Sequence, residues 1–187
     1  MKFIKFFCVV LLTYTLIAGF LFDVPRLPIL NETIRALYFH VPMWFTMIFL
    51  LLLSSFNSYK YINTGKNYYD IKSYNYANVA VYFGVLGLLT GMIWAKFTWG
   101  TFWTNDPKLN GSAIGMLIYL GYFVLRSSVK DESKRGKISS VYNVFAFAML
   151  IPLIFILPRM ADSLHPGNGG NPGFNVYDMN SQLRVVF

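Results

Sequence analysis

Five apolar runs constrain the fold of this chain more than any other feature. A helix needs about 20 mostly apolar residues to cross a hydrocarbon core of about 30 Å. Five runs come close to that length: Phe3–Phe22, Ala36–Phe56, Ala77–Phe97, Gly111–Leu125 and Val141–Leu157. The fourth is expected to begin inside the turn at Asn110-Gly111, and Pro152 should kink the fifth. The sequence predicts an all-α polytopic membrane protein, a bundle of five transmembrane helices forming a single domain over residues 1–187.

The composition agrees with a membrane location. Only 13% of the residues are charged, against about 25% in an ordinary soluble domain. The net charge of +8 does not indicate nucleic-acid binding, because the charges fall between the apolar runs. The first run reaches Phe22 without an Ala-x-Ala cleavage site, which favours a retained span over a signal peptide. The single cysteine, Cys8, lies inside this run and is expected to face lipid or pack; it excludes an intramolecular disulfide and a Cys-x-x-Cys site.

The distribution of Lys and Arg predicts the orientation. Ten of the 16 fall on the side of the N-terminus: Lys2, Lys5, Lys60, Lys66, Lys72, Arg126, Lys130, Lys134, Arg135 and Lys137. The remaining six fall on the other side: Arg26, Arg35, Lys96, Lys108, Arg159 and Arg184. The positive-inside rule therefore places the N-terminus in the cytoplasm.

Two segments on the predicted cytoplasmic side, Asn57–Asn75 and Arg126–Ser140, have the composition of solvated loops. Neither contains a phosphate-cradling Gly-x-x-x-x-Gly-Lys motif. We therefore expect no nucleotide hydrolysis by this chain.

A tryptophan-rich loop, residues 97–111, is predicted on the outer face. Its core, Trp99–Asn110, holds two indoles, the Phe102 ring, one carboxylate and one ammonium, with Asp106-Pro107 as a turn signal. So much aromatic surface indicates a large, flat and partly apolar ligand. For Trp44 and Trp94 we favour the ordinary role of interfacial anchors.

The tail, residues 158–187, also lies on the predicted outer face. Its segment Gly167–Gly173 is so rich in Gly, Asn and Pro that we expect irregular, turn-rich structure. The chain becomes apolar again at Val185–Phe187. This end has two open interpretations, the start of a further span or a short interfacial segment.

The two histidines, His40 and His165, are predicted to reach the same face as the tryptophan-rich loop. Each has an ordinary interpretation as an interfacial residue bonded to a neighbouring loop, but ionisable groups at this depth are functional candidates. Haem suits the available groups better than zinc, because iron takes axial histidines and indoles cover a macrocycle, whereas zinc prefers more ligands. Four cations are available for the propionates, although each also fits simple interfacial snorkelling: Arg35, Lys96, Lys108 and Arg159.

At these residues the sequence resembles the WWD family of haem-handling membrane proteins, whose pattern is close to Trp-Gly-x-x-Trp-x-Trp-Asp-x-Arg-Leu-Thr. Five positions match: Trp99, Gly100, Trp103, Asp106 and Leu109. Three depart from it, with Asn105 in place of the third Trp, Lys108 in place of Arg and Asn110 in place of Thr. Lys108 keeps the charge but not the bidentate fork of an arginine.

Within this family the sequence is most similar to the CcmC, or haem exporter protein C, branch. Tyr38–Pro42 resembles its Tyr-x-His-Val-Pro signature, and Ser163–Pro166 resembles its Ser-Leu-His segment. The resemblance implies non-covalent haem b with His40 and His165 as axial ligands. Together with the cation and aromatic inventory above, we expect cofactor contacts for seven residues: Arg35, Trp99, Gly100, Phe102, Trp103, Asp106 and Lys108. Members of the branch usually have six spans, and five are found here.

The resemblance also implies a function and a set of partners. Such a protein would hold haem at the periplasmic face of a bacterial inner membrane and pass it to a periplasmic, CcmE-like haem chaperone in system I cytochrome c maturation. It would work beside CcmA/CcmB-like ABC transporter subunits and a small CcmD-like membrane subunit, without being an enzyme itself. Two alternatives stay open at this point. One is a relative of the system II haem channel and cytochrome c synthetase, and the other is a structural transporter subunit that binds no haem.

Overall fold

The computed structural model describes residues 2–26, 30–165 and 179–187, and in these ranges the protein is helical without strands. Five long helices dominate: α1 (Lys2–Leu21), α2 (Leu37–Thr64), α3 (Asn67–Trp99), α4 (Pro107–Ser128) and α5 (Glu132–Ile151). Four short elements complete them: the 3-10 helix η1 (Asn31–Ala36), the π-helix η2 (Pro152–Ile156), α6 (Leu157–Met160) and α7 (Ser181–Arg184). Five helical segments are long and apolar enough to cross a membrane, so the predicted fold class is confirmed.

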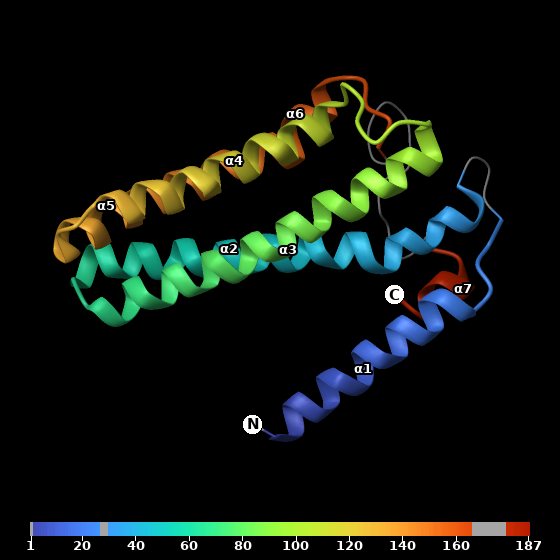
Figure 1. Cartoon of the computed structure of the whole chain (residues 1–187), viewed down its shortest axis with the longest axis horizontal. Coiled ribbons are helices and arrows are strands. Elements are labelled where there is room, and N and C mark those ends of the chain that lie inside the picture. Colours follow the sequence, from blue (N-terminus) through green and yellow to red (C-terminus); the bar gives the residue numbers. More distant parts are fainter. Residues whose placement is uncertain (1, 27–29, 166–178) are drawn as a thin grey trace.

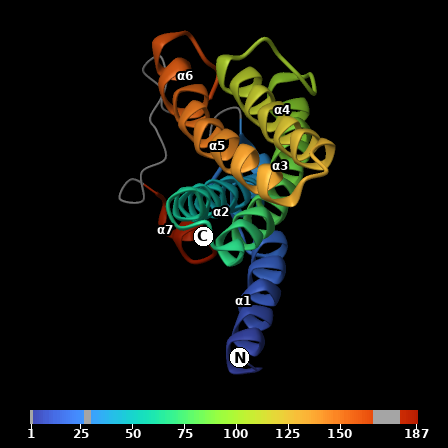
Figure 2. The ribbon, with the colours of Figure 1, turned by 90° about the vertical axis from the view of Figure 1, so that its left-hand side faces the viewer.

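The long helices form two antiparallel pairs. Figure 1 shows α2 beside α3 and α4 beside α5, with the pairs stacked on each other, while α1 diverges from the bundle, as Figure 2 also shows. The shared core is apolar and contains Met47, Leu51, Met116 and Tyr119. Helix α1 has only two buried residues, Ala18 and Gly19, both near its C-terminal end. This end and η1 form a second, smaller core with Leu183 and Val186 from the end of the chain.

Local sequence signals set the helix boundaries at the turns. Gly65 (φ 65°) and Gly100 (φ 84°) follow the last residues of α2 and α3 in the left-handed conformation that glycine adopts without steric cost. Asp106 caps the N-terminus of α4, and Pro107 takes its first position. The fourth span thus begins at Pro107, and the expected start at Asn110-Gly111 was wrong because the Asp-Pro pair opens a helix here. The non-helical part of the tryptophan-rich loop is correspondingly short, residues 100–106.

The expectation of a solvated loop at Asn57–Asn75 was wrong. Helix α2 continues to Thr64 and α3 starts at Asn67, so only residues 65–66 separate them. Four polar residues of this region are buried: Asn57, Ser58, Asp70 and Ser73. Asn143 Nδ2 on α5 donates to the hydroxyl oxygens of three buried serines, at 2.7, 2.9 and 3.0 Å: Ser54, Ser58 and Ser73. The three serines thus partner the Asn143 amide nitrogen inside the bundle, while Asn143 Oδ1 is buried without a partner among the described residues. Composition alone does not distinguish such an inward polar face from a solvated one.

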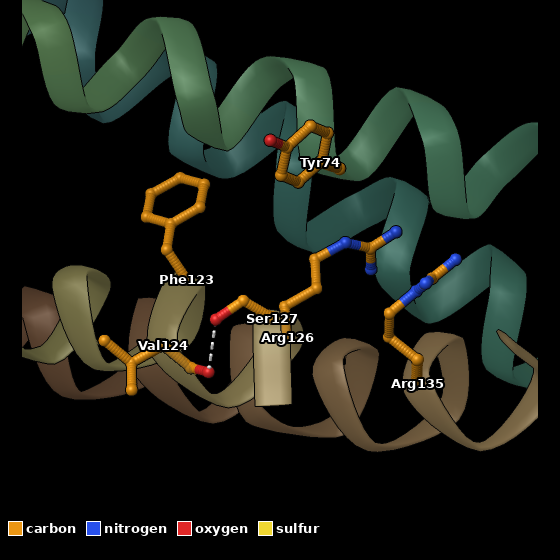
Figure 3. Close-up of a pocket in the computed structure, with 6 residues that line it drawn as sticks. All are labelled: Tyr74, Phe123, Val124, Arg126, Ser127 and Arg135. Carbon is orange, nitrogen blue, oxygen red and sulfur yellow. Dashed lines mark hydrogen bonds between the residues drawn. The ribbon is translucent and has the colours of Figure 1, made fainter. Parts of the chain in front are cut away.

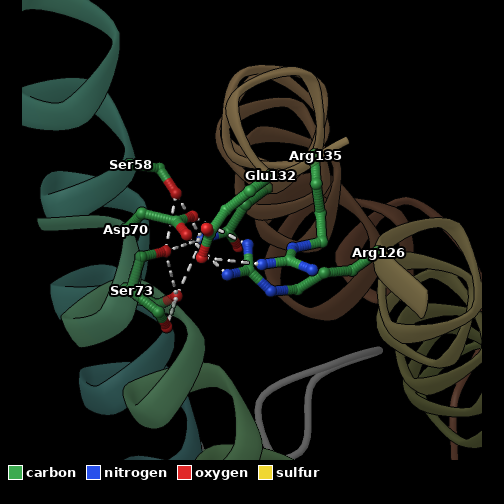
Figure 4. Close-up of polar contacts among 8 residues, drawn as sticks. Ser58, Asp70, Ser73, Arg126, Glu132 and Arg135 are labelled. Carbon is green, nitrogen blue, oxygen red and sulfur yellow. Dashed lines mark hydrogen bonds and ion pairs between the residues drawn. The ribbon is translucent and has the colours of Figure 1, made fainter. Parts of the chain in front are cut away.

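The second expected loop, Arg126–Ser140, is also mostly helical. Only residues 129–131 lie between α4 and α5. Arg126 is not solvated, since it donates to both carboxylate oxygens of buried Asp70 on α3 at 2.7 and 2.6 Å (Figure 4). This ion pair joins the two helix hairpins at the end of the molecule away from the histidines.

The end of the fifth span departs from ideal helix where the sequence predicts it. Pro152 has no N–H to donate, and the helical hydrogen bonding changes to the wider π pattern over Pro152–Ile156 before α6. Gly167–Gly173 lies outside the described residues. Val185 and Val186 follow α7, which packs against the end of α1, and the Tyr14 hydroxyl donates to the Val185 carbonyl at 2.8 Å.

Candidate functional site

The histidine end of the molecule, named here for His40 and His165, brings together four segments that are distant in sequence. His40 is in the first turn of α2, and His165 follows α6. Figure 1 shows the start of α2, the end of α3, the start of α4 and α6 gathered at this end. The two imidazoles are close enough to interact electrostatically. Because the α3–α4 connection lies here too, the tryptophan-rich loop belongs to the same region.

His40 is held by the backbone of α3. Its Nδ1 lies 3.0 Å from the carbonyl oxygen of Gly87 and 3.2 Å from Oγ1 of Thr90. The Thr90 hydroxyl donates its own hydrogen to α3 carbonyls. Both partners therefore accept from the imidazole, so Nδ1 carries the proton in the neutral ring and Nε2 keeps its lone pair.

The position of the His40 ring depends on a glycine and two tryptophans. A Cβ atom at Gly91 would lie 2.7 Å from Cε1 of His40, so only glycine leaves space for the imidazole. The rings of Trp44 and Trp94 stand edge-on to it, with centroids 6.3 and 5.8 Å away. The anchor interpretation of these two tryptophans missed this contact. For Trp44 the signal was its position four residues after His40, on the same helix face.

His165 is held by a carboxylate instead. Its Nδ1 lies 2.9 Å from Oδ1 of Asp106, and a carboxylate only accepts, so here too the proton is on Nδ1 and Nε2 is free for a ligand. Within the described part of the chain, neither Nε2 atom has a hydrogen-bond partner. A histidine that donates from one ring nitrogen and offers the other is the usual arrangement of a metal ligand.

Asp106 connects the tail to the start of α4. It is only 2% exposed, and its Oδ1 also accepts from the N–H groups of Lys108 (2.9 Å) and Leu109 (3.2 Å). Its Oδ2 accepts from the Ser163 hydroxyl and the Leu164 N–H, both at 2.8 Å. One carboxylate therefore caps the helix, fixes the tail and orients His165.

Burial and neighbouring charges determine the protonation of this pair. Burial alone would raise the pKa of Asp106, but the Ser163 hydrogen bond, the charge of His165 and the backbone N–H groups outweigh it, and the pKa is lowered. Burial also lowers the pKa of His165, with Lys108 acting in the same direction and Asp106 opposing both. An ionised Asp106 beside a neutral His165 follows near pH 7, and a neutral imidazole is the form that binds metal.

The aromatic residues of the loop differ in exposure. Trp99, the last residue of α3, is half-buried and stands edge-on to His165 with centroids 5.0 Å apart. Phe102 is 53% exposed and Trp103 39% exposed. Trp103 is fixed through its indole N–H, which donates to Oδ1 of Asn110 at 3.2 Å. The turn at Gly100 thus supports an exposed aromatic surface next to His165.

The predicted cations lie in different surroundings. Arg35 donates from Nε to Glu32 at 2.8 Å and from Nη1 to the carbonyls of Gly19 and Phe22, so it joins η1 to the end of α1. Lys108 interacts electrostatically with Asp106 and Arg159. Lys96 donates to the Gly100 carbonyl at 2.9 Å. Lys108 is therefore the cation in the immediate surroundings of His165 and Asp106.

The donor groups fit a metal that brings most of its own ligands. Among the residues that the structure describes, no three or more His, Cys, Asp or Glu side chains gather into a metal site. Two Nε2 lone pairs are what a porphyrin iron needs at its axial positions, since the macrocycle occupies the others. The half-buried Trp99 ring beside His165, followed by the exposed rings of Phe102 and Trp103, supplies apolar surface of the kind that a macrocycle covers.

The fold and this site define a polytopic membrane protein that presents two oriented histidines and an aromatic loop at one end of a helix bundle. The chain belongs to the CcmC family, heme exporter protein C, whose family model matches residues 1–170. The family predicted from the two histidine motifs and the tryptophan-rich loop is therefore confirmed.

Individual relatives agree with the family match. The heme exporter protein C of Bradyrhizobium diazoefficiens is 28% identical over 135 residues, covering 72% of this chain and 51% of the relative. That of Haemophilus influenzae is 31% identical over 91 residues, covering 49% and 37%. The cytochrome c biogenesis protein CcsA of Cucumis sativus is 32% identical over 106 residues, covering 46% and 33%. The chain thus spans about half, or less, of the length of these curated relatives.

Proposed function

We propose that this protein binds haem b non-covalently at its histidine end, with His40 and His165 as the two axial ligands. The observation that carries the proposal is that both imidazole rings have the same protonation and the same hydrogen-bonding pattern. Each donates from Nδ1 to a fixed acceptor, Gly87 O or Asp106 Oδ1, and each keeps an unpartnered Nε2. A purely structural interfacial histidine has no need of this arrangement at two sites that belong to distant parts of the chain.

The neighbouring residues would then have distinct roles. Trp99, Phe102 and Trp103 cover the macrocycle, and Gly100 makes the turn that presents them. Lys108 pairs with a propionate, and Arg35 offers Nη2, since its Nε and Nη1 are engaged. Asp106 contributes by orienting His165, because both of its oxygens are already saturated with donors.

We further propose that the protein delivers haem to a periplasmic, CcmE-like chaperone during system I cytochrome c maturation. CcmA/CcmB-like ABC transporter subunits and a small CcmD-like membrane subunit would assemble with it, and the ATPase would be theirs. The names of the relatives support a role in haem export and cytochrome c biogenesis. The excess of Lys and Arg at the opposite end of the bundle favours a cytoplasmic N-terminus in a bacterial inner membrane, with the histidines on the periplasmic side.

One alternative keeps haem but changes its fate. The similarity to CcsA favours a shared mode of haem handling, and a protein of that class would pass haem to an apocytochrome instead of a chaperone. The other alternative, a structural subunit without haem, predicts no haem absorbance at all.

Optical absorption of the purified protein tests the proposal. Wild-type protein supplied with haem should show a Soret band typical of iron with two histidine ligands. The double variant His40→Ala, His165→Ala should lose it, because both axial nitrogens are gone. Arg135→Gln, at the other end of the bundle, is the control and should keep the wild-type spectrum. A double variant with an unchanged spectrum would refute axial ligation by these residues.

A further inference from the structure

An open groove lies at the arginine end of the molecule, named for Arg126 and Arg135 and opposite to the histidine end. Its walls come from α3, α4 and α5, and it is lined by Tyr74, Phe123, Val124, Arg126, Ser127 and Arg135. Figure 3 shows the two guanidinium groups extending to the same side, next to Tyr74. Nothing in the proposed haem chemistry uses these residues.

Arg126 is a fixed cation in this groove. Two of its N–H groups bond to buried Asp70, whose side chain is 6% exposed, and its guanidinium carbon lies 5.0 Å from the centroid of the Tyr74 ring. Of the five N–H donors of an arginine, this geometry leaves others unused and held in place. Arg126 therefore offers oriented donors to an anion without having to be immobilised first.

Arg135 is the more available cation. It meets Glu132 through a single contact of 3.2 Å, and the Glu132 side chain is 74% exposed. Exposed pairs of this kind contribute little to stability, so a better anion can replace Glu132. Three further lysines lie near the groove in sequence but do not line it, one on the connector 129–131 and two on the first turns of α5: Lys130, Lys134 and Lys137. The groove is therefore a place where basic charge exceeds the local acidic charge.

The other wall of the groove is apolar. Phe123 and Val124 precede Arg126 on α4, and Val124 is 65% exposed. The lining changes from apolar to cationic within about one helical turn of about 5.4 Å, close to the C-terminal end of an apolar helix that ends at Ser128. A phospholipid has the same order of groups, an anionic phosphate next to apolar acyl chains. A free phosphate has no part that would contact the apolar wall.

We propose that the groove binds the head group of an anionic phospholipid. Its phosphate would accept hydrogen bonds from Arg135 and Arg126, while an acyl chain would lie along Phe123 and Val124. Basic pockets between membrane helices recognise anionic lipids in this way. The proposal is independent of the haem site, which lies at the other end of the bundle.

Native mass spectrometry of the detergent-purified protein tests it, with phosphatidylglycerol as the probe and phosphatidylcholine as the neutral comparison. Wild-type protein should retain phosphatidylglycerol more tightly than phosphatidylcholine. Arg135→Gln should weaken phosphatidylglycerol binding by about fivefold, the value of one basic residue near an anionic lipid. Ser127→Glu should weaken it at least as much, because it puts a negative charge in the groove.

Two matched controls separate this site from general surface charge. Lys134→Gln removes the basic residue next to Arg135, and Ser128→Glu adds the same charge one residue away from Ser127. Both serine hydroxyls donate to the Val124 carbonyl, but Lys134 and Ser128 do not line the groove. Both controls should bind phosphatidylglycerol as wild type does. Equal losses in variants and controls, equal retention of phosphatidylcholine, or equally tight binding of inorganic phosphate would each overturn the proposal.

Discussion

The two histidines reach the same end of the bundle but are held by different kinds of acceptor. His40 lies on a transmembrane helix and donates to the backbone of the neighbouring helix, at Gly87. His165 lies on the tail and donates to one side chain, Asp106, which also receives Ser163 and Leu164. The support of His40 is part of the packing of α2 on α3, whereas the support of His165 depends on a single carboxylate.

This difference bears on the proposed transfer of haem, which requires release as well as binding. His40, the proposed helix-held ligand, contacts Trp44, which packs against the core that contains Met47 and Leu51. The tail-held ligand can leave when the Asp106 contacts break, without loss of the bundle. We therefore expect a shared haem to be lost first from His165, with His40 remaining as the fixed ligand.

The largest effect is expected for Asp106→Ala. The substitution removes the carboxylate that orients His165, attaches the tail and caps α4. Loss of an outer-shell partner of a ligating histidine typically costs 10–100-fold in metal affinity, and the lost tail contacts place this variant towards the upper limit. A titration with haem, followed by the Soret band, measures the change, and the residual spectrum should be that of iron held by His40 alone.

Asp162→Ala is the matched control for Asp106. Asp162 is an exposed carboxylate next to Ser163 on the same tail, so its removal changes the charge without removing the support of His165. Its haem affinity should stay within about twofold of the wild-type value, a difference of about 0.4 kcal/mol. Similar losses in both variants would show that tail charge, and not orientation by Asp106, governs binding.

A smaller effect is expected at the helix-held ligand, for Gly91→Ala. The added Cβ would meet Cε1 of His40 at 2.7 Å, so the ring must tilt away from its Gly87 and Thr90 partners. We expect about a tenfold loss of haem affinity, equivalent to about 1.4 kcal/mol, in the same titration. Gly121→Ala provides the control because its Cβ meets the Tyr142 hydroxyl at 2.8 Å, a similar clash far from the histidines. If both variants lose affinity equally, general helix packing explains the effect.

The sequence predicted the fold well because membrane insertion depends on a simple property. Five apolar runs of sufficient length are enough to predict five spans, and all five are present. The segment Asn57–Asn75 was assigned wrongly because composition does not show whether a side chain points into the bundle or towards solvent. Ser58 and Ser73 face Asn143 inside the bundle, and a polar residue in sequence looks the same whether its partner is water or another helix.

The candidate site also contains residues that the sequence predicted and residues that it did not. His40, His165 and Asp106 could be singled out from short motifs, because each motif is local. The hydrogen-bond partners that hold these side chains in place could not be predicted, since Gly87 is 47 residues from His40 and Ser163 is 57 residues from Asp106. Contacts over such separations arise from how the helices pack, which no local pattern specifies.

The smallest expected effect concerns the electrostatic support of His165. The Lys108 ammonium disfavours the protonated imidazole and so lowers the pKa of His165, together with burial. Lys108→Gln should therefore raise the pKa of His165, and the imidazole would then begin to protonate at a higher pH. Histidine-selective NMR of haem-free protein measures the titration. Lys96→Gln is the control, because Lys96 bonds to the Gly100 carbonyl and does not act on His165.

Since a protonated imidazole cannot bind iron, the haem-loaded Lys108→Gln variant should lose the His165 ligand at a higher pH than wild type. An unchanged or lowered His165 pKa would mean that the tail is held in place by Asp106 without influence from the start of α4.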